Sequence, residues 1–232
     1  MELTFASYNI HKAVGLDGRR DPDRIITVLR ELDADIIALQ EADRRFGQRA
    51  AVLPRAMLDD THWRPLAVSE RPRSLGWHGN ALLVRRDIHC TLSEALHLPT
   101  LEPRGAVMGE LELEGRPLRI LGAHLDISGI RRRDQVHAML GHCAARPRLP
   151  TVIMGDFNQW GRLTGAMRAF GVAWQQITPG ASYPARRPIA PLDRIVTTPD
   201  WDYVASGVHH SAMAAQASDH LPVWARLTLP KK

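Results

Sequence analysis

Runs of apolar residues along the chain predict more strands than helices. Two helices are expected: residues 21–32, which begin with Asp21 at a capping position and Pro22 in the first turn, and residues 131–144, which are amphipathic. The strands are expected where short runs are continuously apolar or alternate with a period of two. These runs are residues 3–9, 35–40, 80–86, 106–113, 117–125, 151–156, 194–198 and 222–229.

Several of these predicted strands follow one another without a helix between them. This order differs from the strict strand–helix alternation of a parallel doubly wound sheet. It favours a mixed sheet, or two sheets packed together with helices outside. The proline-containing stretch from Leu98 to Arg104 is too short for a domain linker, so residues 1–232 are expected to form a single domain.

The composition is that of a globular protein, with 232 residues, 44% hydrophobic and 24% charged. No apolar run reaches the roughly 18 residues of a membrane span, and the first residues lack the pattern of a signal peptide. Cys90 and Cys143 have no metal-ligand spacing, so buried free thiols and a cytoplasmic location are expected. A monomer is the expected state.

Positive charge exceeds negative charge, and the net charge is +5. Three of the 30 basic residues are lysines (Lys12, Lys231 and Lys232), which leaves 27 arginines. Arginine forks suit phosphate recognition, but codon usage biased toward arginine is the favoured explanation. The arginines are scattered, so they indicate a weakly cationic face and no basic tail.

Polar residues that could carry chemistry gather at the ends of six predicted strands. Singly, most are explained as turn formers, but Glu41 is costly next to a buried run unless it is paired or bound to a cation. Together they predict a polar site for phosphoester hydrolysis assisted by a hard cation, Mg²⁺ or Mn²⁺, since oxygen donors predominate. The residues are Asn9, His11, Glu41, His124, Asp126, Asp156, Asn158, Asp193, Asp219 and His220.

The stretch VIMGDFNQW, residues 152–160, is the most specific of these strand ends. Asp156 and Asn158 lie two residues apart, on the same side of the pleat, and are expected to address one phosphate. Gly155 is expected to permit a close backbone approach. The replacement Asp156→Asn is expected to slow the reaction on the order of a hundredfold while the melting temperature hardly moves or rises.

The motifs YNIH, LQEAD, AHLD, GDFN, LDRI and SDHLPV occur in this order between about Ser7 and Val223. They resemble those of the endonuclease/exonuclease/phosphatase superfamily, whose fold resembles pancreatic deoxyribonuclease. The resemblance implies an α/β (α+β) four-layer sandwich of two mixed, mainly antiparallel sheets flanked by helices, with the site at one rim. It also implies metal-dependent hydrolysis of phosphate esters.

The resemblance assigns the metal to Glu41 as the main ligand, with Asn9 beside it. Asp219 would help to hold the metal or a water molecule. The cofactor implied is Mg²⁺ or Mn²⁺.

The resemblance also assigns catalytic roles. Asp156 would activate or orient the attacking water, and Asn158 would hold the phosphate. His220 would contact the phosphate or act as a base, with Asp193 orienting its ring, so the identity of the base stays open. His124 would be a second histidine facing the phosphate, for which the sequence offers no carboxylate partner.

Further residues match the family pattern less specifically. Arg104 in EPRGAV is either a phosphate-contacting arginine or an ordinary surface residue. Asn80 in HGNALL is a candidate for substrate contact, although shaping its loop explains it as well. Arg133 and Gln135, at the start of the second predicted helix, resemble residues that brace the site from behind.

The substrate is less well defined than the reaction, because superfamily members cut DNA, RNA, abasic sites, sphingomyelin and inositol phosphates. A phosphodiesterase or nuclease is expected, with nucleic acid the leading substrate by a modest margin. A phospholipid headgroup comes next, and phosphomonoesters are an alternative. The chain lacks a lysine-rich stretch with interleaved aromatics that would follow a nucleic-acid backbone. An alternative from a different functional class is a binding protein that kept this fold and lost its catalytic activity.

Overall fold

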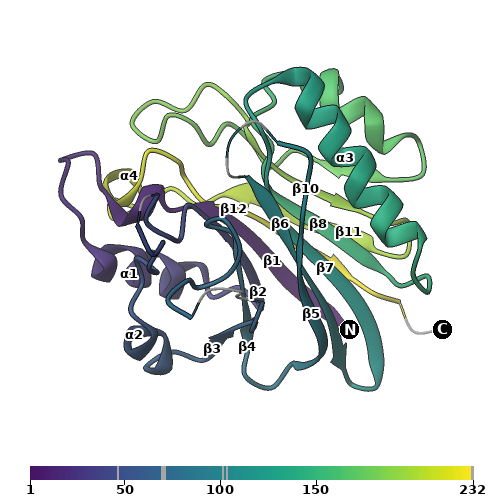
Figure 1. Cartoon of the computed structure of the whole chain (residues 1–232), viewed down its shortest axis with the longest axis horizontal. Coiled ribbons are helices and arrows are strands. Elements are labelled where there is room, and N and C mark those ends of the chain that lie inside the picture. Colours follow the sequence, from purple (N-terminus) through teal and green to yellow (C-terminus); the bar gives the residue numbers. More distant parts are fainter. Residues whose placement is uncertain (46, 69–71, 101, 103, 231–232) are drawn as a thin grey trace.

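Two six-stranded sheets face each other in the computed structural model, which describes residues 1–45, 47–68, 72–100, 102 and 104–230 (Figure 1). The pairs β1–β2 and β7–β8 are parallel and the other pairs are antiparallel. The first sheet has the order β11 (Asp202–Val208), β12 (Val223–Thr228), β1 (Glu2–Asn9), β2 (Ile36–Gln40), β4 (Ala81–Arg85) and β3 (Trp63–Pro65). The second has the order β5 (His89–Leu96), β6 (Gly105–Leu113), β7 (Arg116–His124), β8 (Thr151–Asp156), β10 (Asp193–Thr197) and β9 (Gln175–Ile177).

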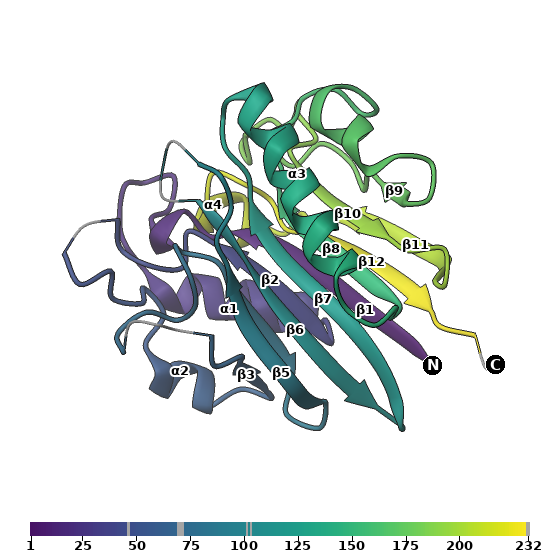
Figure 2. The ribbon, with the colours of Figure 1, turned by 45° about the vertical axis from the view of Figure 1, so that its right-hand side comes forward.

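Helices cover the outer face of each sheet, which gives the expected four layers (Figure 2). The larger ones are α1 (Pro22–Leu32) on the first sheet and α3 (Gly129–Ala144) on the second. The others are α2 (Arg55–Asp59), α4 (Ala214–Ala217) and the 3₁₀ helices η1 (His11–Ala13) and η2 (Gly165–Phe170).

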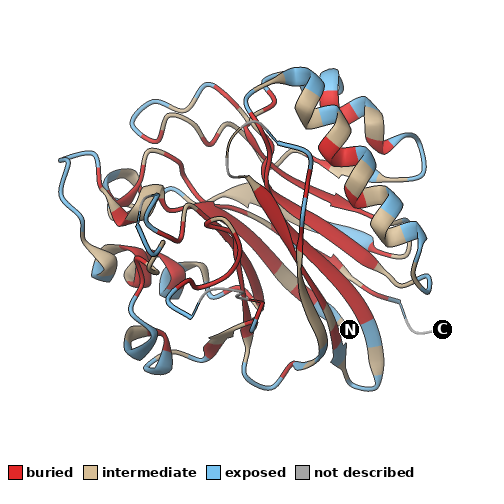
Figure 3. Ribbon diagram, viewed as in Figure 1, coloured by how far each residue is buried: buried red, intermediate tan, exposed pale blue. Residues whose placement is uncertain are grey.

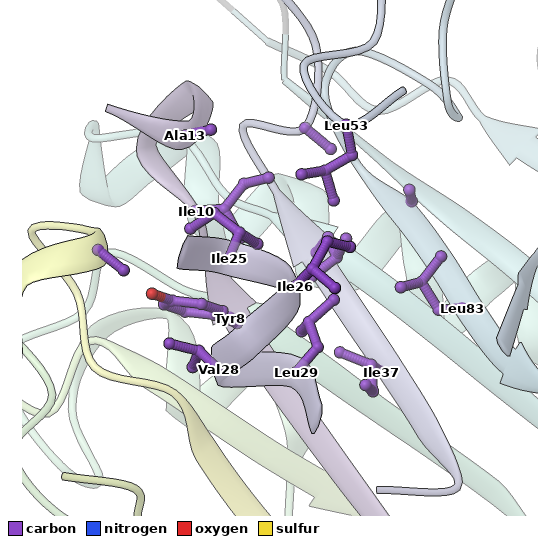
Figure 4. Close-up of a cluster of buried hydrophobic side chains, with 14 of the residues drawn as sticks. Tyr8, Ile10, Ala13, Ile25, Ile26, Val28, Leu29, Ile37, Leu53 and Leu83 are labelled. Atoms are coloured by element: carbon purple, nitrogen blue, oxygen red, sulfur yellow. The ribbon is translucent and has the colours of Figure 1, made fainter. Parts of the chain in front are cut away.

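The sequence of α1 explains both where it begins and which face it buries. The Asp21 carboxylate accepts hydrogen bonds from the backbone N–H groups of Asp23 and Arg24, as the capping pattern predicted. The side chains at helical spacing pack against β1 and β2 (Figure 4). Each contributes roughly 1.5–3 kcal/mol on full burial. These side chains are Ile25, Ile26, Val28 and Leu29.

The core between the sheets is formed by side chains from the facing strands, which are buried along most of their length (Figure 3). Phe5 packs edge-on against Trp201, with ring centroids 5.2 Å apart. Gly122 of β7 lies where the sheets come close, because a Cβ there would be only 3.1 Å from the Cβ of Ala38. Similarly, a Cβ on Gly155 would lie 1.8 Å from Ala123 O. Gly155 therefore permits a close approach between backbones, and the backbone that it approaches is that of β7.

All eight predicted strands are present, but the sequence reasoning missed β3, β5, β9 and β11. Each of the four is an edge strand, and β11 shows mostly exposed and half-buried positions. Edge strands bury less of each face, so their apolar pattern is weak. Cys90 and Cys143 are free thiols, although both are half-buried and not fully buried as expected. None of the helices in the described segments has the length and apolarity to cross a membrane.

Candidate active site

The polar strand ends meet at one edge of the two sheets. Asn9 pairs with Gln40 across the parallel strands β1 and β2, so Glu41 follows at the same edge. In the second sheet, Asp156 is aligned with His124 on one side and with Asp193 on the other. The register therefore brings residues from distant parts of the chain into one site.

Asp156 is the centre of this arrangement. Its Oδ2 accepts a hydrogen bond from Asn9 Nδ2 at 3.1 Å and lies 3.3 Å from His124 Nε2 and 3.7 Å from His220 Nε2. Its Oδ1 accepts the backbone N–H of Asn158 at 2.9 Å. Burial opposes ionisation, but the two histidines outweigh it and hold the pKa of Asp156 far below its ordinary value.

The ring of His220 is fixed by Asp193, as the resemblance implied. His220 Nδ1 lies 2.9 Å from Asp193 Oδ2, which also accepts a hydrogen bond from Ser182 Oγ at 2.5 Å. Burial disfavours the charged ring, yet the charges of Asp193 and Asp156 raise the pKa of His220 to about 10. Burial, to which the nearby Asp156 adds, raises the pKa of Asp193. The ring of Tyr183 packs on His220, with centroids 4.8 Å apart.

His124 has the carboxylate partner that the sequence did not reveal, and this partner is Asp156. Arg104 reaches the same position, because its Nη1 contacts His124 Nε2. Its guanidinium also lies 3.5 Å from Glu102 Oε2. The structure thus places Arg104 inside the site rather than on the open surface.

Glu41 occupies the more open part of the site. It directly follows β2, has a left-handed backbone with φ 54°, and contacts Lys12 Nζ through its Oε2. Burial works against its charge, but His124, Lys12 and Arg104 keep the pKa of Glu41 below the ordinary value. The carboxylate opens onto a cleft at the molecular surface. The cleft is lined by Lys12, Glu41, Asp43, Arg44, Arg45, Arg49, His78, Gly79, Glu102, Arg104 and His124.

The donor chemistry fits a hard divalent cation at Glu41. The carboxylate is ionised at neutral pH and partly exposed, and the oxygen-bearing side chain of Asn9 ends the adjacent strand. A second group of metal-ligand atoms, on Asp156, Asp193 and His220, lies within 4.8 Å among the described residues. In that group His220 and Asp193 already bind each other. Asp219 lies outside it, with its Oδ1 3.9 Å from His11 Nδ1.

The two asparagine candidates differ in how they are held. Asn158 has a left-handed backbone, φ 50°, and its Nδ2 donates to Leu125 O at 2.9 Å, which ties the two site loops together. Asn80 is fully buried and donates to the carbonyl groups of Trp77 and Gly105 at 3.2 and 3.1 Å. This environment supports the loop-shaping interpretation of Asn80 and leaves it no exposed surface for substrate contact.

The expected brace behind the site is formed by Gln135, but Arg132 takes the place of Arg133. Gln135 Oε1 accepts the backbone N–H of Asp126 at 2.9 Å. Arg132 Nη1 donates to the carbonyls of Asp126 and Ile127 at 3.2 and 2.6 Å, whereas Arg133 is exposed. The two neighbouring arginines lie on different faces of α3, which the sequence motif alone does not distinguish.

Three residues at the site were missed by the sequence reasoning. Ser182 and Tyr183 contact the Asp193–His220 pair from a segment without a recognisable motif. Lys12 on Glu41 had a signal, because it is the only lysine before Lys231 in an arginine-rich chain.

The model of the endonuclease/exonuclease/phosphatase family matches residues 6–220. The chain belongs to this family. No curated protein matches the sequence. Several solved structures share the fold at low identity. An endonuclease/exonuclease/phosphatase family protein from Bacteroides thetaiotaomicron has a TM-score of 0.78 at 19% identity, covering 100% of this chain and 99% of that one.

Two other structural neighbours differ in what their names describe. D. rerio TDP2 complexed with a single-strand DNA product has a TM-score of 0.74 at 15% identity, covering 98% and 99% of the two chains. A mannosyl-6-phosphatase from Bacteroides thetaiotaomicron has a TM-score of 0.75 at 19% identity, covering 97% and 99%. The names of these two neighbours thus describe a DNA-bound protein and a sugar phosphatase that share this fold.

Proposed function

We propose that this protein is a metal-dependent phosphodiesterase, with Asp156 as the acceptor of a proton from the attacking water. The observation that carries the proposal is the surroundings of Asp156, whose carboxylate meets Asn9, His124 and His220 at one buried point. The shifted pKa values leave Asp156 ionised and His220 protonated at neutral pH. The base left open by the sequence is then Asp156, and His220 is a donor.

The other groups stabilise the negative charge of a phosphate in this proposal. Arg104 and protonated His220 offer hydrogen bonds to phosphoryl oxygens, and His124 lies between Arg104 and Asp156. Asn158 orients Asp156 through its backbone N–H, while its side-chain amide donates to Leu125 O and holds the adjoining loop. Glu41 with Asn9 would hold Mg²⁺ or Mn²⁺, which supplies Lewis-acid stabilisation of the phosphate charge when bound.

The test is a substrate panel with the purified full chain. A bis-aryl phosphate, plasmid DNA, single-stranded RNA, phospholipid vesicles and an aryl phosphomonoester would each be assayed with Mg²⁺, Mn²⁺ or EDTA. We expect turnover of at least one diester that EDTA abolishes. Full activity in EDTA would sink the metal-dependent mechanism, and no turnover of any substrate would favour a binding protein with this fold.

The variant Glu41→Ala tests the metal position directly. It should abolish heat of Mn²⁺ binding in calorimetry and lower diester turnover on the order of a hundredfold or more, because the charge stabilisation is lost. Glu112→Ala, on the exposed face of β6, is the matched control. Unchanged Mn²⁺ binding in Glu41→Ala would move the metal elsewhere, with the Asp156–Asp193–His220 group as the next candidate.

A further inference from the structure

Three loops that border the active site expose large apolar side chains. Residues 125–131 follow β7 and include the first residues of α3, residues 157–164 follow β8, and residues 183–190 precede β10. Five residues on them have 60–66% of their surface exposed. We call these five residues the apolar rim: Ile127, Ile130, Trp160, Leu163 and Ile189.

The three loops lie at the same edge as the catalytic groups. Asn158 Nδ2 bonds to Leu125 O at 2.9 Å and joins the first two loops, and Tyr183 in the third packs on His220. α3 packs against η2, which begins directly after the loop that follows β8. Ile127 comes three residues after His124, so a fully extended chain would separate them by at most about 11 Å.

The backbone of these loops is held in place, so the apolar side chains are presented on ordered segments. Arg132 donates to Ile127 O at 2.6 Å, and the buried Arg194 donates to Gly161 O at 3.3 Å. Gln159 Nε2 donates to Thr164 Oγ1 at 3.4 Å. A single exposed apolar residue is ordinary, but five around one site mark an interaction surface.

Charge on the same three loops is entirely positive at the surface. Arg162, Arg186 and Arg187 are exposed, and Arg131 is half-exposed. The one acidic residue in these segments, Asp126, is buried. The charged side chains exposed among the apolar rim are thus arginines alone.

We propose that the apolar rim docks this protein on an anionic phospholipid surface, with the active site facing the headgroups. Apolar side chains interspersed with arginines fit the boundary between acyl chains and headgroups, and guanidinium groups pair with lipid phosphates. The substrate assignment that follows rests on the proposed function. If the protein is a phosphodiesterase, the diester that it hydrolyses belongs to a phospholipid headgroup.

The composition of the rim favours lipid over the nucleic acid that the sequence reasoning ranked first. Bases of single strands stack on aromatic rings, and Trp160 is the only aromatic residue in the rim. The four aliphatic members have no comparable partner on a base. Acyl chains accept aliphatic and aromatic side chains alike.

The test measures binding without turnover, in EDTA, by cosedimentation with vesicles of phosphatidylcholine alone or with an equal part of phosphatidylglycerol. Single-stranded DNA binding is measured in parallel. The rim variant Ile127→Ser/Trp160→Ser is compared with Tyr203→Ser/Val204→Ser, which removes exposed apolar groups at the opposite end of the first sheet. The charge variant Arg162→Gln/Arg187→Gln is compared with Arg148→Gln/Arg226→Gln, which has the same net charge.

We expect the wild type to bind the mixed vesicles and the rim variant to bind at least tenfold more weakly. The charge variant should lose roughly 25-fold, which corresponds to ~1 kcal/mol for each arginine near an anionic surface. Both controls should bind as the wild type does. A blue shift of tryptophan emission on binding should disappear in Trp160→Phe, which keeps an apolar ring there.

Three results would overturn the docking proposal: no binding to the mixed vesicles at low salt, equal binding by the rim variant, or a rim variant that loses DNA binding alone. Hydrolysis of a soluble bis-aryl phosphate tests the proposed function independently of membrane docking. A wild type that binds vesicles but cleaves nothing keeps the docking surface and rejects the phosphodiesterase. A rim variant that cleaves the soluble diester normally has kept its fold.

Discussion

The active site has two halves that differ in burial and in whether their charged groups can be reached by a ligand. The closed half consists of Asp156, His124, His220 and Asp193, whose side chains are 0–6% exposed. The open half consists of Glu41, Lys12 and Arg104, whose side chains are 16–27% exposed and line the cleft. In the closed half the charged groups bind one another. In the open half Lys12 and Glu41 form an ion pair that a ligand can reach.

This difference indicates a division of labour. The closed half is preorganised, so its dipoles and charges need no rearrangement when negative charge develops on a phosphate. The open half has solvent on one side, where a metal ion and a substrate can bind. Variants in the closed half should therefore change rate and stability together, and variants in the open half should change ligand binding first.

Among the side chains of the closed half, the largest effect is expected from Asp156→Asn. The variant keeps the shape of the side chain but removes the ionised oxygen shared by His124 and His220, so turnover of the diester should fall on the order of a hundredfold or more. The measurement is kcat with saturating Mn²⁺, beside the control Asp202→Asn at the exposed start of β11.

The same variant should also lose thermal stability, which reverses the expectation from the sequence. Relief of repulsion between carboxylates would have left the melting temperature unchanged or higher. The structure instead surrounds Asp156 with two histidines that lower its pKa. The charged form therefore stabilises the fold fully above the ordinary carboxyl pKa of 3.8, and this contribution is lost as the pH falls toward the lowered pKa. A melting temperature equal to that of the wild type at neutral pH would contradict this account of the closed half.

The sequence predicted the fold well, and it singled out polar residues that the structure brings to one edge of the sheets, for reasons visible in particular elements. Strands such as β8 are fully buried, so their apolar runs are unambiguous, and Asp21 with Pro22 gives α1 a definite start. Acids, amides and histidines at strand ends were informative because strands that meet at one edge bring such residues together.

The sequence could not supply contacts that depend on register between distant segments. The partnership of His124 with Asp156, which are 32 residues apart in the chain, depends on the alignment of β7 and β8. The pairing of Lys12 with Glu41 depends on the unusual backbone of η1, where Lys12 has φ 57°. The choice of Arg132 over Arg133 depends on the rotation of α3 about its axis.

A smaller effect is expected from Asp193→Asn, which tests how the closed half keeps the His220 ring protonated. The pKa of His220 is about 10 in the folded protein against an ordinary 6.5. Its charged form therefore stabilises the fold fully below pH 6.5, and this contribution disappears as the pH rises toward 10. The variant removes the nearest negative charge, so the alkaline limb of the pH–rate profile should move to lower pH, with a roughly tenfold loss of rate. An unchanged alkaline limb would assign that limb to another group.

The smallest effect is expected in the open half, from Lys12→Met. Lys12 contacts the carboxylate that we assign to the metal, so the ammonium and a divalent cation share or compete for Glu41. Both side chains are about a quarter exposed, and ion pairs of this kind contribute at most ~1 kcal/mol. Removing the ammonium should therefore tighten Mn²⁺ binding by no more than about fivefold, measured by calorimetry, with Lys12→Arg as the charge-preserving control. The melting temperature in EDTA should barely change, in contrast to Asp156→Asn. Weaker Mn²⁺ binding in Lys12→Met would mean that Lys12 supports the metal site and does not compete with it, and the two halves would then be coupled through Glu41.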